Sequence, residues 1–81
     1  MDIKILGAGC ANCKLLQQRT IDALAALNAD ADVRKVEDPI EIAGFGVLAT
    51  PALVINGKVK VVGRVPATQQ IAQFIREASQ G

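Results

Sequence analysis

The sequence predicts an α/β domain with the element order βαβαββα, in which a four-stranded mixed sheet is flanked by helices. Short apolar runs typical of strands are separated by longer segments with helical periodicity. Toward the carboxyl end, an Asn-Gly pair between two apolar runs is the strongest short signal for a β-hairpin. The 81 residues are close to the lower limit for one independent hydrophobic core, so we expect a single domain over residues 1–81.

The first half of the chain predicts a strand, a long helix and a second strand. Residues 2–6 are largely apolar and lead into a glycine-rich turn at residues 7–9, which indicates a strand that opens into a loop. Residues 11–28 carry an apolar stripe at three- and four-residue steps, as an amphipathic helix does. Residues 33–37 lie between turn-forming aspartates and indicate a strand. Because a helix joins these two strands, we expect them to be parallel.

The second half predicts a short helix, a hairpin and a last helix. Residues 38–41 read Asp-Pro-Ile-Glu, a capping box that begins a short helix, which Gly44 should end. The apolar runs 52–55 and 58–62 flank the Asn-Gly pair and predict an antiparallel hairpin. Apolar residues at helical spacing within residues 66–79 predict the final helix.

Composition and charge narrow the function classes. The chain is 51% hydrophobic and 21% charged, which is typical of a folded domain rather than a disordered one. Its nine basic and eight acidic side chains are scattered and give a net charge of +1, so we expect neither a nucleic acid nor an anionic membrane as partner. The amino terminus lacks a signal-peptide pattern, and the longest apolar run, residues 48–55, is too short to span a bilayer. We therefore expect a cytoplasmic protein.

The only cysteines, Cys10 and Cys13, form a Cys-x-x-Cys motif between the first strand and the first helix. Two thiols at this spacing suit a structural bridge, a metal site or a reversible redox pair. Cytoplasmic thiols are kept reduced, so a pair there is more often redox-active or metal-binding than permanently bridged. A purely structural disulfide here would close a loop of about four residues and add only about 2 kcal/mol to the free energy of unfolding. The start of the helix already fixes this segment.

The position of Cys10 at the predicted helix start favours ionisation of its sulfur. Unpaired backbone N–H groups and the positive end of the helix dipole stabilise a thiolate there. Cys10 is therefore the expected nucleophile, which attacks a substrate disulfide to form a mixed disulfide. Cys13 lies one helical turn further, on the apolar stripe, so we expect it to be less exposed and to resolve that intermediate.

Metal binding through the same two cysteines is the main alternative, and a non-catalytic redox sensor is a third. Two thiolates suit Cu(I), and small copper chaperones also carry Cys-x-x-Cys after their first strand. Their element order is βαββαβ, whereas this sequence predicts a helix after Asp38 and another at its end. Zinc would need four ligands, and the chain offers two cysteines and no histidine, so we assign no metal site.

Beyond the cysteines, several motifs occur in a fixed order along the chain. They are Cys10-Ala11-Asn12-Cys13 after the first strand, Thr50-Pro51 before the third, Asn56-Gly57 in the hairpin and Gly63-Arg64 after it. Together they resemble the smallest thioredoxin-like proteins, in particular short redox-active disulfide proteins intermediate between thioredoxin and glutaredoxin. The resemblance covers nearly the whole chain. It implies a thioredoxin fold, thiol-disulfide exchange, and a flavin-dependent disulfide reductase as electron donor. Gly63-Arg64 stands where glutaredoxins often carry a glycine pair that approaches glutathione, and no acidic pair opens the last helix, so we expect protein disulfides rather than glutathione as substrates. We expect no bound cofactor.

The resemblance also implies a substrate groove. In the proteins that the sequence resembles, the bond between Thr50 and Pro51 is cis and lies beside the cysteine loop, where the backbone before the proline pairs with an extended substrate. Ala11 and Asn12 would complete this groove. A trans proline that merely opens a strand is the alternative. Lys4 stands where thioredoxins carry a buried aspartate, so the role of that aspartate in proton transfer is not carried over.

Overall fold

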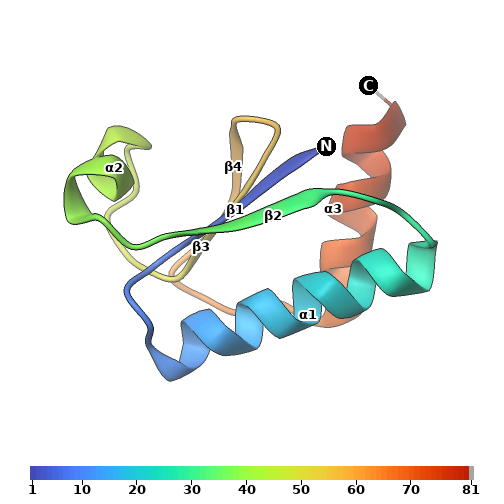
Figure 1. Cartoon of the computed structure of the whole chain (residues 1–81), viewed down its shortest axis with the longest axis horizontal. Coiled ribbons are helices and arrows are strands. Elements are labelled where there is room, and N and C mark those ends of the chain that lie inside the picture. Colours follow the sequence, from blue (N-terminus) through green and yellow to red (C-terminus); the bar gives the residue numbers. More distant parts are fainter. Residues whose placement is uncertain (81) are drawn as a thin grey trace.

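The computed structural model describes residues 1–80 and confirms the predicted order of elements (Figure 1). The elements are β1 (Asp2–Leu6), α1 (Ala11–Leu27), β2 (Asp32–Val36), α2 (Pro39–Gly44), β3 (Ala52–Ile55), β4 (Lys58–Val62) and α3 (Thr68–Gln80). The second strand begins one residue earlier than predicted, because Asp32 already pairs with Asp2 in the parallel ladder. Within residues 1–80, no helix is long and apolar enough to cross a membrane.

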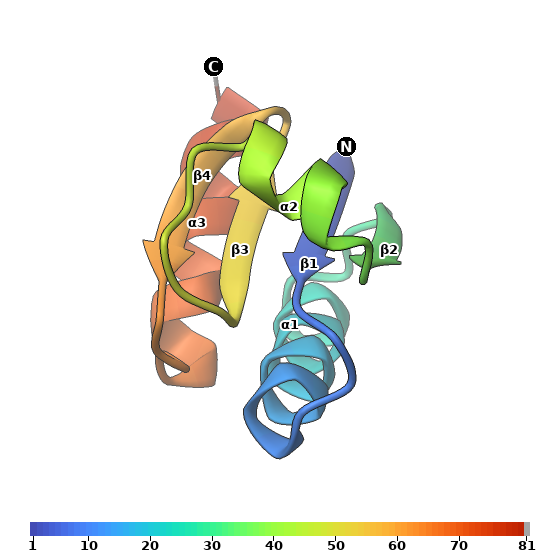
Figure 2. The same cartoon turned by 90° about the vertical axis from the view of Figure 1, so that its left-hand side faces the viewer.

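The sheet is mixed and has the strand order β2-β1-β3-β4 (Figure 2). Strand β1 pairs in parallel with β2 and antiparallel with β3, while β3 and β4 form the predicted antiparallel hairpin. Asn56 and Gly57 form its turn, both with positive φ (51° and 83°). Because β1 lies inside the sheet, the cysteine loop that follows Leu6 starts from a strand fixed on both sides.

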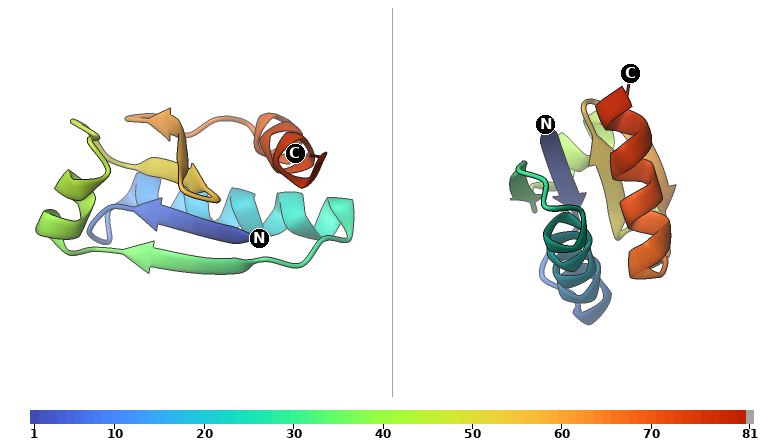
Figure 3. Two further views of the ribbon diagram at one scale, coloured as in Figure 1. Left: turned by 90° about the horizontal axis from the view of Figure 1, so that it is seen from above. Right: turned by 90° about the vertical axis from the view of Figure 1, so that its right-hand side faces the viewer.

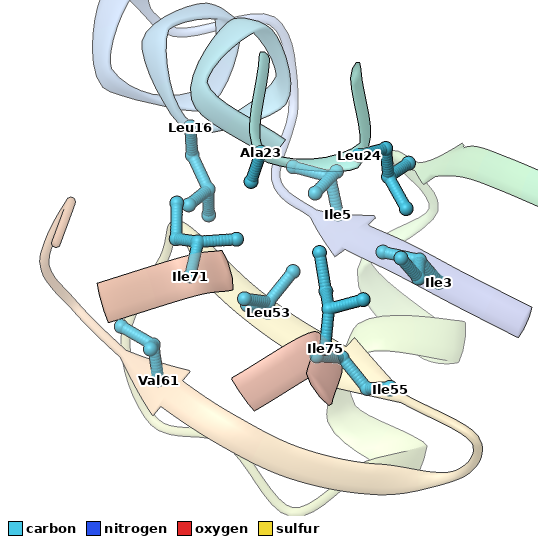
Figure 4. Close-up of a cluster of buried hydrophobic side chains, with 10 residues drawn as sticks. All are labelled: Ile3, Ile5, Leu16, Ala23, Leu24, Leu53, Ile55, Val61, Ile71 and Ile75. Carbon is cyan, nitrogen blue, oxygen red and sulfur yellow. The ribbon is translucent and has the colours of Figure 1, made fainter. Parts of the chain in front are cut away.

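One face of the sheet is covered by α1 and α3, which pack against each other (Figure 3, right). The main hydrophobic core lies between these helices and the sheet (Figure 4). Its buried members come from both helices and three strands and are Ile3, Ile5, Leu16, Ala23, Leu24, Leu53, Ile55, Val61, Ile71 and Ile75. The apolar stripe predicted for α1 is the face that this helix buries.

The opposite face is covered more thinly, by α2 and the segment after it. Four buried residues from β1, β2 and β3 form a second cluster, against which Ile42, Phe45 and Val47 pack. Phe45 and Val47 therefore belong to the core on this face. No residue of α2 itself is fully buried.

The start of α2 differs in one respect from the sequence prediction. Asp38 is the N-cap, and its carboxylate accepts a hydrogen bond from the backbone N–H of Ile40 at 3.1 Å. Within the described residues, Glu41 does not return a bond to the backbone of Asp38, and its side chain is exposed. The cap is therefore a simple aspartate cap rather than a full capping box, with the Glu41 side chain exposed.

Candidate active site

The cysteine loop leaves the carboxyl end of β1, and α1 begins directly after it (Figure 1). Cys10 is the N-cap of α1, with an extended backbone (φ −73°, ψ 163°). Its Sγ accepts a hydrogen bond from the backbone N–H of Cys13 at 3.1 Å, and its carbonyl accepts one from Lys14. The predicted capping position of Cys10 is thus confirmed, and its sulfur faces the unpaired end of the helix.

Cys10 and Cys13 form a disulfide, with their Cα atoms 5.1 Å apart. The two residues differ in exposure: Cys10 is exposed, whereas only 5% of Cys13 is accessible to solvent. This asymmetry arises because Cys10 precedes the helix while Cys13 lies on its buried stripe. An incoming thiol or disulfide therefore reaches the sulfur of Cys10 far more easily than that of Cys13.

The bond between Thr50 and Pro51 is cis, as the resemblance implied. Pro51 is buried and its carbonyl accepts a hydrogen bond from Gly63 at 2.8 Å, while Thr50 is exposed. Gly7 connects this segment to the cysteines, since a Cβ atom added to Gly7 would contact both the sulfur of Cys13 and, at 3.6 Å, the Cβ of Thr50. Gly7, Cys13 and Thr50 therefore lie close together, although Thr50 is far from the other two in the sequence.

The remaining residues of the predicted groove, Ala11 and Asn12, are exposed on the first turn of α1. Leu48 is fully exposed two residues before Thr50. Nothing in the sequence distinguishes Leu48 from the buried residues of the same apolar run, 48–55.

Lys4 and Lys14, the two lysines closest in sequence to the cysteines, lie in different surroundings. The ammonium group of Lys4 lies 3.5 Å from a carboxylate oxygen of Asp2 and 5.4 Å from the centre of the Phe45 ring. Lys4 therefore covers the thin face of the sheet rather than replacing a buried acid. Lys14 is exposed on the first turn of α1, which carries no acidic residue. All eight acidic side chains of the chain are exposed or half-buried.

Comparison with known proteins agrees with this geometry. The sequence model of a family described as "Thioredoxin domain" matches residues 1–76. The chain belongs to this thioredoxin family. It is accordingly a thiol-disulfide oxidoreductase, and its substrates are protein disulfides. The Cu(I)-carrier alternative finds no support in the family, and the observed element order βαβαββα also differs from that of the copper chaperones.

Two relatives and one solved structure show how far the similarity extends. A thioredoxin of Methanothermobacter thermautotrophicus is 35% identical over 75 residues, covering 93% of this chain and 97% of the relative. A thioredoxin of Methanocaldococcus jannaschii is 29% identical over 79 residues, covering 98% of this chain and 91% of the relative. Thioredoxin 1 of Thermosipho africanus, at 20% identity, has the same fold, with a TM-score of 0.68 over 99% of this chain and 96% of that one.

Proposed function

We propose that Cys10 is the attacking cysteine and Cys13 the resolving cysteine of this oxidoreductase. The observation that carries the assignment is the difference in exposure between the two residues, combined with the hydrogen bond from the Cys13 N–H to the Cys10 sulfur. A thiolate at the helix N-cap is stabilised by that N–H and by the helix dipole. Lys14 adds a positive charge on the same turn.

The exchange proceeds in two balanced steps. In the first, the thiolate of Cys10 attacks one sulfur of the substrate disulfide; a mixed disulfide forms, the substrate S–S bond breaks, and one substrate thiolate leaves. In the second, Cys13 loses its proton and attacks the sulfur of Cys10; the Cys10–Cys13 bond forms and the second substrate thiolate leaves. Two electrons have then passed from the dithiol to the substrate. Among residues 1–80 no acidic side chain is buried, so we assign the proton of Cys13 to solvent rather than to a carboxylate of the chain.

The substrate groove of the proposal consists of Ala11, Asn12, Thr50 and Pro51. Two observations support this groove. Ala11, Asn12 and Thr50 are exposed, and Gly7 lies between the Thr50 side chain and the buried sulfur of Cys13. A flavin-dependent disulfide reductase would return the two electrons to the oxidised protein. The proposed setting is the cytoplasm, where other thiol systems keep exposed dithiols reduced.

A trapping experiment with an insulin disulfide tests the roles of the two cysteines. The Cys13→Ser variant should accumulate a mixed disulfide between Cys10 and insulin, because nothing resolves it, whereas Cys10→Ser should form none at neutral pH. Accumulation with Cys10→Ser instead would reverse the assignment. The unaltered protein should reduce insulin with a midpoint potential between about −300 and −180 mV, the range of exchange catalysts.

The electron donor is tested separately. A purified thioredoxin reductase with its nicotinamide cofactor should support turnover of insulin by this protein. Turnover with glutathione and glutathione reductase, but none with thioredoxin reductase, would show that glutathione is the donor.

A further inference from the structure

Gly7 occupies an unusual place at the end of β1. It is buried, its φ is 151°, and a Cβ atom built on it would overlap the sulfur of Cys13. We infer that Gly7 is a positioning residue for the redox couple: its missing side chain leaves the space that the Cys13 sulfur occupies in the disulfide. Gly7 thereby sets the balance between the oxidised and reduced forms. This inference rests on the proposed exchange between Cys10 and Cys13.

A side chain at position 7 would have little room to avoid the sulfur. The backbone N–H of Gly7 donates to the carbonyl of Val36 at 2.9 Å, which fixes the main chain. Leu6, just before it, is paired on one side with Val36 and on the other with Ala52. In the direction of Thr50, the added atom would already be in van der Waals contact at 3.6 Å. The sulfur of Cys13 would therefore be the group that has to move.

The two redox states differ in how freely that sulfur moves. In the disulfide, the bond to Cys10 fixes the Cys13 sulfur, and Cys10 is itself fixed as the helix cap. Two electrons and two protons convert the disulfide to the dithiol, and the Cys13 side chain can then rotate about its Cα–Cβ bond to another staggered position. A methyl group at position 7 therefore disfavours the oxidised form more than the reduced form.

A side chain at position 7 would change the redox equilibrium through steric overlap with the sulfur, and not through a hydrogen bond or backbone strain. The Gly7 N–H is already bonded to Val36 and does not stabilise the sulfur. A φ of 151° is unfavourable for any L side chain, but this penalty is present in both redox states and cancels in the potential.

The test compares Gly7→Ala with Gly9→Ala. Gly9 lies in the same loop with a φ of 67°, but an added Cβ would meet nothing within 4 Å. Gly9→Ala therefore introduces backbone strain without touching the sulfur. The equilibrium between disulfide and dithiol is measured in mixtures of oxidised and reduced dithiothreitol, which supplies and accepts the two electrons.

Gly7→Ala should shift the equilibrium constant toward the dithiol by about tenfold or more, as expected for an extra methyl group in a filled site. Tenfold corresponds to about 30 mV for this two-electron couple. Gly9→Ala should leave the constant within a factor of about two, because its added methyl group meets no atom within 4 Å. Equal constants for the two variants would overturn the inference. Failure of the unaltered protein to reduce insulin would instead refute the proposed function, whatever the two variants show.

A second measurement decides the matter if oxidised Gly7→Ala does not fold. The same change is made in a Cys13→Ala background, which removes the sulfur, and the loss of stability is compared with that in the oxidised parent. If the sulfur is the obstacle, Gly7→Ala should lower stability less in the Cys13→Ala background than in the oxidised parent. A Gly7→Ala/Cys13→Ala protein that folds, while Gly7→Ala alone does not, would give the same answer. Equal losses, or unfolding in both backgrounds, would show that the sulfur is not the obstacle.

Discussion

Replacing Cys10 by serine and by alanine separates its role as helix cap from its role in exchange. Both variants should lose all activity, because neither side chain forms a disulfide. They should differ in stability, because the oxygen of serine can accept the bond that the Cys13 N–H now donates to sulfur at 3.1 Å, whereas alanine has no acceptor. Removing such a cap costs about 1 kcal/mol.

The difference is measurable by urea unfolding, with reduced unaltered protein as the reference. For a small domain the free energy of unfolding falls by about 1 kcal/mol for each molar of urea, so the alanine variant should unfold about 1 M earlier than the serine variant. Using the reduced reference removes the contribution of the disulfide itself. Coincident unfolding curves for the two variants would mean that residue 10 does not cap α1, and the argument for a stabilised thiolate would lose its basis.

Further predictions concern the core and the proposed groove. Ile71→Val, at a fully buried position, should lower stability by about 1 kcal/mol, whereas Ile40→Val, at a position 81% exposed, should change it by less than about 0.5 kcal/mol in the same urea assay. Leu48 lies two residues before Thr50 and is fully exposed, so Leu48→Ser should leave the urea midpoint unchanged. We expect the same change to raise the KM for insulin severalfold, because it removes an apolar contact for the substrate next to the proposed groove. Reduction of a small aromatic disulfide is the control, and an unchanged KM for insulin would show that Leu48 does not contact the substrate.

Most of the fold was predictable because its helices, caps and turns depend on residues that are close together in the sequence. The apolar stripe of α1, the aspartate cap of α2 and the Asn-Gly turn each act within a few residues, so the sequence displays them directly. The cap formed by Cys10 is local in the same way. The cis bond at Pro51 was expected only from resemblance, since the chain itself contains no local signal that distinguishes cis from trans.

What the sequence did not reveal depends on contacts between distant segments. The sequence indicates only a glycine-rich turn at Gly7, and the closeness of Gly7 to the Cys13 sulfur arises only when α1 folds back beside β1. Phe45 and Leu48 are both apolar and only three residues apart, yet the first packs on the sheet and the second is fully exposed. Composition cannot separate them, because the path of the chain after α2 decides which one meets the core.

The unequal covering of the two faces of the sheet implies an uneven resistance to local opening. Helices α1 and α3 are held by the main core, whereas α2 has only six residues and none of them is fully buried. Amide hydrogens of α2 should therefore exchange with solvent through small fluctuations that leave the other helices intact. Since the chain runs from α2 to Thr50 and Pro51, this local opening would also loosen one side of the proposed substrate groove.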